Sequence, residues 1–297
     1  FVFPHCAMAT GYAARISLTS QQAMFSLSVP AVMPAILPVF RWCCFRMTYC
    51  VAISLKSGLV FASDSRTNAG TDQVSQYGKL HTLGIDGERP FVLLSAGNLA
   101  TTQAVLTQIR HELRDNPDWC LCKARYMDEV ADYIGEISRQ QQNRFAAGSG
   151  VSAGFNPTVS FILGGQIRGE PPGLHLIYRE GNHITTSLAT PFLQIGETKY
   201  GKPILDRIIK ADSSLEDAAR CALVSMDSTM QSNVTVGPPV EMLLYEKDSL
   251  SLKRYMRLDE KHPYLRELRS SWAENINSAF DALPRFNWES AGAPPLE

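Results

Sequence analysis

Hydrophobic residues follow a strand-like pattern in the part of the chain that begins at residue 48. Residues 48–55 (TYCVAISL) are β-branched and apolar, which is typical of a strand buried on both faces. Lys56-Ser57-Gly58 predicts a turn, and 59–66 (LVFASDSR) predicts a second strand. Similar short runs predict strands over 80–84 and 91–95.

Longer stretches place their apolar residues on one helical face. They predict helices over about 99–113 and 125–144, a helix that starts near Tyr200, and a helix over 214–231. Ser214-Leu215-Glu216-Asp217 has the form of a capping box at the start of the last of these. Further strands are predicted over 158–163, 174–179, 183–187, 192–195, 240–245 and 251–256, with a hairpin turn at Glu180-Gly181-Asn182.

The order of these elements is strands, two helices, strands, two helices and strands. This alternation predicts an α+β fold in which helices cover the outer faces of two antiparallel sheets. We expect a single domain over 48–260. A stripe of apolar residues from Leu265 to Leu283 predicts a helix in a C-terminal extension, 261–297. The stripe would pack on its own domain or, the alternative that we favour, on a neighbouring subunit.

Residues 1–46 differ from the rest of the chain. They are apolar, but Pro30, Pro34 and Pro38 would break a membrane helix, and no convincing signal-peptide cleavage site follows. We expect 1–47 to be an upstream extension or pro-segment that is absent from the mature protein. Removal of Met47 would leave Thr48 with a free α-amino group.

Composition narrows the classes of partner and cofactor. The 297 residues carry a formal net charge of −1, so no charged field favours nucleic acid or a membrane. The seven cysteines form no disulfide framework, which predicts reduced thiols in the cytoplasm, with Cys120 and Cys122 as structural residues. The six histidines show no paired ligand spacing, so we expect no metal and no cofactor.

An N-terminal threonine can serve as nucleophile and base at once. A hydroxyl needs a nearby base, and a free α-amine, with a pKa of about 8, supplies one in the same residue. A lysine ammonium would lower the pKa of that amine further, and a carboxylate would hold the lysine in place. Lys79 and Asp64 are the candidates, brought to Thr48 by neighbouring antiparallel strands. Gly97, at the end of a predicted strand, could donate its N–H to an oxyanion.

Taken together, these residues resemble the catalytic half of a proteasome β-subunit. Thr48, Ser63-Asp64-Ser65-Arg66, Gly78-Lys79 and Ser95-Ala96-Gly97 occur in the order of that family. The opening residues, the stretch 194–201 (QIGETKYG) and the long tail most resemble the bacterial Anbu branch, which is related to the HslV peptidase. The resemblance implies the four-layer αββα fold of N-terminal-nucleophile hydrolases, a threonine peptidase, a peptide or protein substrate, and like subunits in a ring or open helical ring. Thr48 would be the nucleophile, Lys79 the lysine, Asp64 its carboxylate and Gly97 the oxyanion amide.

The chain departs from the family pattern at two places. Glu197 stands where proteasome subunits usually have the serine that supports the nucleophile, so an acid there would tune or blunt the site. Asp227 fits the family carboxylate near the end of a later helix, but Met230 stands in place of the serine that follows it. By the same resemblance, Ser95 and Leu99 border the substrate pocket. The sequence names neither a substrate nor an ATPase partner.

Three other interpretations compete with this one. Gly150-Val151-Ser152-Ala153-Gly154 matches a serine-hydrolase elbow, but a helix precedes it and a strand follows, which is the wrong context. Residues 196–202 nearly match a phosphate-binding loop, yet Pro203 lacks the required hydroxyl and N–H. The third alternative keeps the fold and loses the chemistry, as a ring-forming scaffold whose pocket Glu197 blocks.

Overall fold

The computed structural model describes residues 48–68, 74–115, 120–148, 155–286 and 289, all within one compact unit. The predicted extension 1–47 and Ser152 lie outside the described residues. The elements follow the predicted order of strands, two helices, strands, two helices and strands, and a last helix follows them.

The first sheet is antiparallel and has the order β10-β1-β2-β11-β12. Its strands are β1 Tyr49–Leu55, β2 Gly58–Asp64, β10 Phe192–Gly196, β11 Val240–Glu246 and β12 Arg254–Leu258. β1 pairs with β2 in a register that places Cys50 opposite Ser63, and it pairs with β10 on its other side. The N-terminal end of β1 is therefore held between two strands.

The second sheet is also antiparallel and has the order β5-β6-β7-β8-β9. Its strands are β5 Leu80–Ile85, β6 Arg89–Gly97, β7 Val159–Gly165, β8 Gly173–Ile177 and β9 His183–Thr185. A short ribbon of β3 Arg66–Asn68 and β4 Val74–Gln76 lies between β2 and β5 along the chain. The ribbon thus connects the first sheet to the second.

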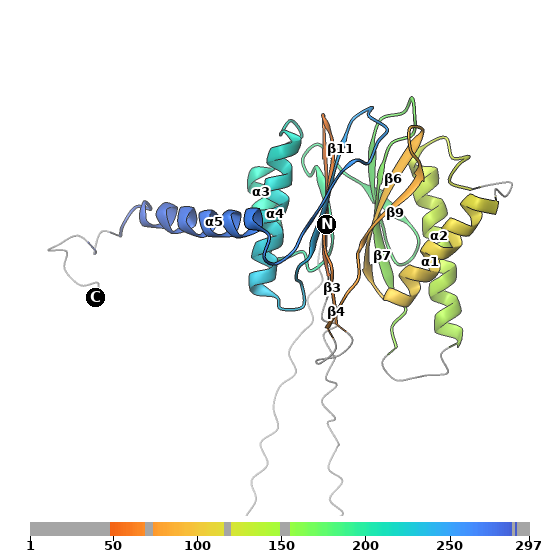
Figure 1. Ribbon diagram of the computed structural model, residues 1–297, viewed down its shortest axis with the longest axis horizontal. Helices are drawn as coiled ribbons and strands as arrows, with labels where there is room; N and C mark the ends of the chain where they lie inside the picture. Colours follow the sequence, from red (N-terminus) through yellow and green to blue (C-terminus); the bar gives the residue numbers. More distant parts are fainter. Residues whose placement is uncertain (1–47, 69–73, 116–119, 149–154, 287–288, 290–297) are drawn as a thin grey trace, which may run out of the picture. The chain divides into compact units, whose positions relative to one another are not determined.

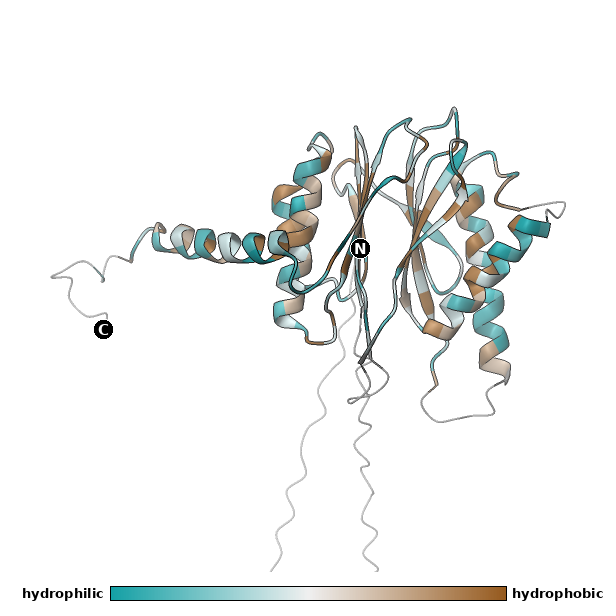
Figure 2. Ribbon diagram, viewed as in Figure 1, coloured by the Kyte–Doolittle hydropathy of each residue, from teal (hydrophilic) through white to brown (hydrophobic). Residues whose placement is uncertain are grey.

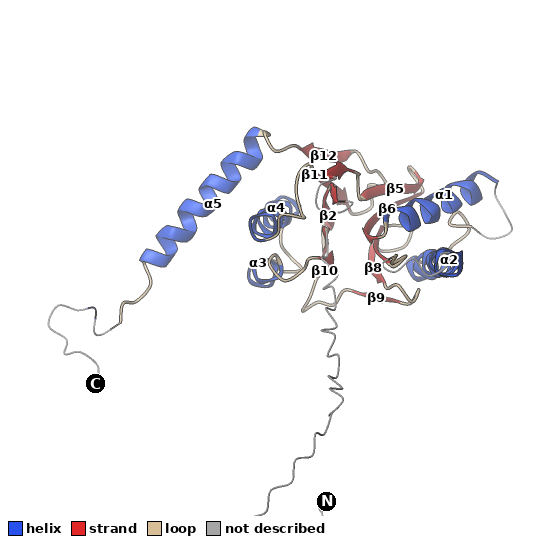
Figure 3. Ribbon diagram, turned by 90° about the horizontal axis from the view of Figure 1, so that it is seen from below, coloured by secondary structure: helices blue, strands red, loops and turns tan. Residues whose placement is uncertain are grey.

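Helices cover the outer face of each sheet, as Figures 1 and 3 show. The helices are α1 Leu99–Asp115, α2 Met127–Gly148, α3 Lys202–Ile208, α4 Leu215–Ser232 and α5 Pro263–Asp281. The pair α1 and α2 packs on the second sheet, and the pair α3 and α4 packs on the first. The predicted four-layer αββα architecture is confirmed.

Both faces of β1, β2 and β11 in the first sheet are buried, which explains their nearly continuous apolar runs, whereas the edge strand β12 is largely exposed. Successive side chains of a strand point to opposite faces. In β1, Tyr49, Val51 and Ile53 face the helices, whereas Cys50 and Ala52 face the other sheet. Apolar residues accordingly dominate the strands in Figure 2.

The ends of several elements match the signals in the sequence. Ser214 precedes α4, and its hydroxyl accepts a hydrogen bond from the backbone N–H of Asp217 at 3.0 Å, as the capping pattern predicts. The predicted strand over 59–66 is interrupted at Ser65, where the first sheet ends and the ribbon begins. The strand β4, with the short polar sequence Val-Ser-Gln, was not predicted because no apolar pattern marks it.

Two cysteines differ from the prediction of reduced thiols. Cys120 and Cys122 form a disulfide in the turn before α2. This disulfide closes a local turn and links no two elements, so the spacing of the seven cysteines gave no sign of it. Cys50 and Cys221 are buried free thiols.

Within the described residues, no helix is both long enough and apolar enough to span a membrane.

Candidate active site

Thr48 lies immediately before β1 and is almost completely enclosed, with 7% of its surface exposed. Its carbonyl oxygen accepts a hydrogen bond from the backbone N–H of Glu197 at 2.7 Å. Gly196 makes this close approach possible. It has a φ of +86°, and a Cβ at this position would lie 1.9 Å from the Thr48 carbonyl oxygen. The β10 backbone therefore fixes the position of Thr48.

A buried ion pair lies next to the start of β1. The Lys79 Nζ donates to Asp64 Oδ1 at 2.6 Å and to the Arg66 carbonyl oxygen at 2.6 Å. The Asp64 side chain is fully buried, and only 9% of the Lys79 side chain is exposed. We predicted both residues of this pair from the sequence and expected them to come from neighbouring strands. That expectation was wrong: Asp64 ends β2 in the first sheet, and Lys79 precedes β5 at the edge of the second.

Asp64 also holds the backbone on both sides of the site. Its Oδ1 accepts from the Tyr49 N–H at 3.0 Å, and its Oδ2 accepts from the Gly237 N–H at 3.3 Å. Complete burial raises the pKa of the Asp64 carboxyl, while the Lys79 ammonium and these two amides oppose the rise. The carboxylate is thus placed to orient both Lys79 and the first residue of β1.

One small pocket brings the predicted residues together. Thr48, Lys79 and Gly97 all line a cavity of about 40 Å³, and so do Ser95 and Leu99, the two residues that the resemblance placed beside the substrate. Gly97 ends β6 with a φ of +124°, and a Cβ there would lie 2.3 Å from the Thr158 carbonyl oxygen. Gly97 therefore lies on the wall of the cavity that contains Thr48.

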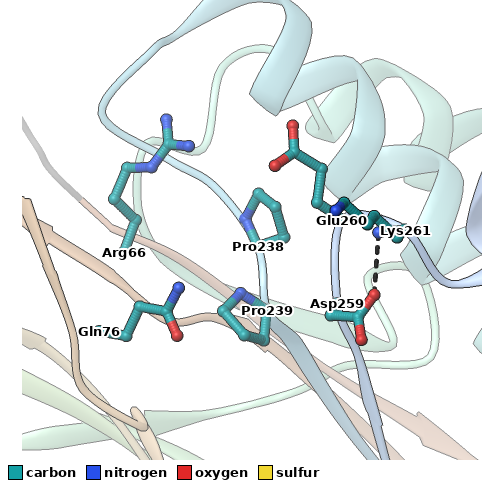
Figure 4. Close-up of a pocket in the computed structure, with 7 residues that line it drawn as sticks. All are labelled: Arg66, Gln76, Pro238, Pro239, Asp259, Glu260 and Lys261. Carbon is teal, nitrogen blue, oxygen red and sulfur yellow. Dashed lines mark hydrogen bonds between the residues drawn. The ribbon is translucent and has the colours of Figure 1, made fainter.

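A larger pocket of about 290 Å³ lies elsewhere (Figure 4). Arg66 and Gln76 form one side of it, Asp259 and Lys261 lie on the other, and neither Thr48 nor Lys79 lines it. The larger pocket lacks a candidate nucleophile with a base. The smaller pocket that contains Thr48 is therefore the better candidate for the chemistry, despite its size.

His81 lies next to the cavity that contains Thr48, and the sequence did not predict it as a site residue. Its Nε2 lies 3.3 Å from the Ser95 Oγ. Burial, together with the charge of Arg110, lowers the pKa of His81 to about 4. The imidazole is therefore neutral near neutral pH.

Glu197 is bound to a residue that the sequence did not suggest. Its Oε2 accepts from Asn233 Nδ2 at 3.1 Å, and its Oε1 lies 3.9 Å from Lys199 Nζ. Asn233 caps the C-terminus of α4, and its Oδ1 accepts from the N–H and the hydroxyl of Thr235. The place of Asn233 just after the predicted end of the helix is a local signal for a cap, but it does not indicate the contact with Glu197.

Asp227 makes its contact with the C-terminal helix. Its Oδ1 accepts from the Arg269 Nε of α5 at 2.6 Å, and the Asp227 side chain is 5% exposed. Asp227 does not line the cavity that contains Thr48. A structural role in the packing of α5 on α4 accounts for this contact, and the catalytic role of Asp227 stays a prediction.

Two histidines lie together although their sequence spacing gave no sign of it. The β8–β9 register places His175 and His183 on one face, with their Nδ1 atoms 3.2 Å apart. His183 Nε2 lies 3.2 Å from Asp132 Oδ1 of α2. Among the described residues, no group of three or more His, Cys, Asp or Glu side chains is arranged to hold a metal ion.

Comparison with solved structures decides the family. A protein from Yersinia bercovieri described as Anbu (ancestral beta-subunit) is 44% identical, with a TM-score of 0.76, and the match covers 81% of this chain and 100% of that one. The chain belongs to the Anbu family. The Anbu complex from Pseudomonas aeruginosa, described as a helical assembly, is 43% identical with a TM-score of 0.77, and the match covers 83% and 100% of the two chains.

Another Anbu structure, a Gly-1 mutant from Hyphomicrobium sp. strain MC1, is 43% identical with a TM-score of 0.75, and the match covers 81% of this chain and 99% of that one. No family model and no curated protein matches the chain. Membership of the Anbu family agrees with the resemblance that the order of Thr48, Asp64, Lys79 and Gly97 suggested. The catalytic roles of these residues remain predictions.

Proposed function

We propose that this Anbu protein is a threonine amidohydrolase acting on peptide bonds, with Thr48 as its nucleophile once Thr48 is the N-terminal residue. The observation that carries the proposal is the shared pocket of Thr48, Lys79 and Gly97, with Lys79 held by the buried Asp64 at 2.6 Å. Few structural needs explain a buried ion pair beside an enclosed threonine, because such a pair contributes little to stability by itself.

The proposed reaction uses groups that line the pocket. The Thr48 α-amine takes the proton of the Thr48 hydroxyl as Oγ attacks the carbonyl carbon of the substrate. The Lys79 ammonium favours the unprotonated amine by its charge, and the Gly97 N–H stabilises the oxyanion. The amine passes its proton to the leaving nitrogen as the C–N bond breaks. Water, activated by the same amine, then hydrolyses the ester on Thr48.

The proposal includes self-assembly. The helical assembly of the Pseudomonas aeruginosa relative, all of whose chain is matched, supports a ring or open helical ring of like subunits. A closed or nearly closed arrangement would also restrict the access of folded proteins to the pocket.

A specific observation favours the scaffold alternative. The cavity at Thr48 has a volume of only about 40 Å³, far below the several hundred that a small-molecule site usually offers. If the cavity does not open, the protein would form assemblies without turning over a substrate. Glu197 does not line this cavity, and its carboxylate contacts Asn233 and Lys199, so the small volume alone carries this alternative.

One experiment separates the two functions. Protein with Thr48 as its first residue is treated with a peptide epoxyketone, which closes a ring only with a hydroxyl and an amine of the same residue. We expect one adduct per subunit by mass spectrometry, its loss in Thr48→Ala, and partial retention in Thr48→Ser. A matched protein that keeps one residue before Thr48 should form no adduct. Absence of the adduct on the free N-terminus would leave the scaffold function standing and the peptidase rejected.

A further inference from the structure

A second buried carboxylate lies next to the Asp64–Lys79 pair. Glu241 is in β11, between β2 and β12, and is 9% exposed. The alternation of the strand gives it the same face as Leu243 and Tyr245, which pack between the two sheets. A charge at this position needs hydrogen-bond partners to offset its loss of water.

Three donors from three different parts of the chain supply those partners. Glu241 Oε2 accepts from the Lys79 backbone N–H at 3.2 Å and from the Ser65 hydroxyl at 3.3 Å. Its Oε1 accepts from the Tyr255 hydroxyl at 2.8 Å. Ser65 follows β2, Lys79 precedes β5, and Tyr255 is in the edge strand β12.

The carboxylate also fills the space beneath the Gly78–Lys79 backbone. A Cβ on Gly78 would lie 3.0 Å from Glu241 Oε2 and 3.2 Å from Oε1, so a side chain at residue 78 would push the carboxylate away. Gly78 lines the cavity that contains Thr48. The contact therefore ties the wall of that cavity to β11.

Glu241 contacts Lys79 directly and through a neighbouring residue. It accepts a hydrogen bond from the Lys79 backbone N–H. It also binds Ser65, and the next residue, Arg66, accepts a hydrogen bond from the Lys79 ammonium through its carbonyl oxygen. We infer that Glu241 is a positioning residue that holds Lys79 in place for the reaction at Thr48, with Tyr255 steadying its carboxylate from the sheet edge. The inference rests on the proposed function for the use of Lys79, but the positioning itself does not depend on turnover.

The first test measures the position of Lys79 without any activity. The intact assembly is treated with acetic anhydride, and the rate of acetylation is followed by mass spectrometry that assigns the acetyl group to Lys79. Glu241→Leu should raise this rate about tenfold, the factor that corresponds to one weakened charge-assisted hydrogen bond. Glu241→Gln keeps an acceptor oxygen, and its Lys79 acetylation rate should remain within about threefold of the rate in the protein without substitutions. Tyr255→Phe, which removes a single hydroxyl, should fall between the two.

Glu112 of α1 provides a matched control, because it also accepts a hydrogen bond from a tyrosine hydroxyl, that of Tyr133, and does not line the cavity that contains Thr48. Glu112→Gln should leave the modification rate of Lys79 unchanged. Equal Lys79 acetylation rates in the protein without substitutions, in Glu241→Leu and in Tyr255→Phe would overturn the inference. If Glu241→Leu does not fold, Tyr255→Phe and Glu241→Gln still decide it.

The second test uses peptide turnover. Mispositioning of Lys79 should lower kcat by about 10- to 100-fold in Glu241→Leu while KM changes little, and Glu241→Gln should recover most of the loss. A parallel change in kcat and protein stability without any change at Lys79 would indicate a merely structural role. If the unmodified protein shows neither turnover nor an epoxyketone adduct, the proposed function fails, and the Lys79 rates still test the position of that side chain.

Discussion

At the scale of single residues, position 196 has the strongest requirement for glycine in the site. Its positive φ and the 1.9 Å approach of a would-be Cβ to the Thr48 carbonyl oxygen leave no space for any side chain. The hydrogen bond from Glu197 to the same oxygen depends on that approach. Thr48 is thus placed by backbone contacts, which a side-chain survey of the sequence would not identify.

Gly196→Ala should therefore lower the free energy of unfolding and reduce the epoxyketone reaction of Thr48. The control is Gly87→Ala, since Gly87 also has a positive φ of +78° but has no atom within 4 Å of a would-be Cβ. Gly87→Ala should cost about 1–2 kcal/mol from the backbone alone. Gly196→Ala should cost at least about 2 kcal/mol more in urea unfolding at equal protein concentration. Equal costs would contradict the clash with Thr48.

The Asp64–Lys79 pair leads to a second residue-scale prediction. Lys79→Met leaves a buried carboxylate without its cation and should lower the free energy of unfolding by about 3–5 kcal/mol. The double variant Lys79→Met with Asp64→Asn should lose less than the sum of the two single variants. The control is the exposed pair Lys202–Asp206 at 2.7 Å, where Lys202→Met should cost less than about 1 kcal/mol. Similar losses at both lysines would show that burial of the pair has no effect.

How much of the site could be predicted depends on the kind of contact. Thr48, Asp64, Lys79 and Gly97 were found from their order in the sequence, and they line or adjoin one pocket. Glu241 was missed because a single carboxylate in an apolar strand carries no local signal, and Asn233 was missed because its place after a helix indicates a cap but not a contact with Glu197. Their contacts with Lys79 and Glu197 join residues that lie 162 and 36 positions apart, which only the folded chain brings together.

At the scale of elements, the β8–β9 hairpin illustrates the same limit. Periodicity predicted both strands and the turn between them, because alternating apolar residues carry that information. The contact between His175 and His183 follows from the register of the hairpin, in which Ile177 lies opposite His183. One more or one fewer residue in the turn would change the register and separate the two rings.

This hairpin predicts a pH dependence of stability. Burial, together with the charge of His183, lowers the pKa of His175 to about 4, below the ordinary value of 6.5. Between these two values the unfolded chain binds more protons, so the free energy of unfolding should fall as the pH decreases from 6.5 to 4. His81, whose pKa is also about 4, contributes in the same direction.

The variant His175→Gln should reduce this decline by about 1–2 kcal/mol between pH 6.5 and pH 4 in chemical unfolding. His111 is exposed, and His111→Gln serves as the control. A pH profile of His175→Gln that matches the profile of the unmodified protein would contradict the assigned role of His175.

At the scale of the whole molecule, the helix α5 is only partly covered. Leu265 is buried and Leu268 packs against the core, so the first turns of α5 rest on the domain. Farther along the same apolar stripe, Ile276 is 47% exposed and Phe280 is 70% exposed. The sequence predicted the stripe as a helix but could not show which part the domain itself covers.

Under the proposed self-assembly, a neighbouring subunit covers the rest of the stripe. The variant Ile276→Ser with Phe280→Ser should increase the fraction of single subunits in sedimentation velocity. It should change the free energy of unfolding of the single subunit by no more than about 0.5 kcal/mol, because neither side chain is buried there. Leu188→Ser, at a position that is 88% exposed, controls for the removal of an exposed apolar residue. Unchanged assembly in the α5 variant would place the contact between subunits elsewhere.

Asp64 ends a strand of the first sheet and Lys79 lies immediately before a strand of the second, so the ion pair forms only when the two sheets are in contact. A newly made chain in which only one sheet has formed does not yet contain the ion pair, because its partner residue is still on the undocked half. Under the proposed function, hydrolysis of peptide bonds would begin only after both halves have come together, so an incomplete subunit would not cleave the proteins around it.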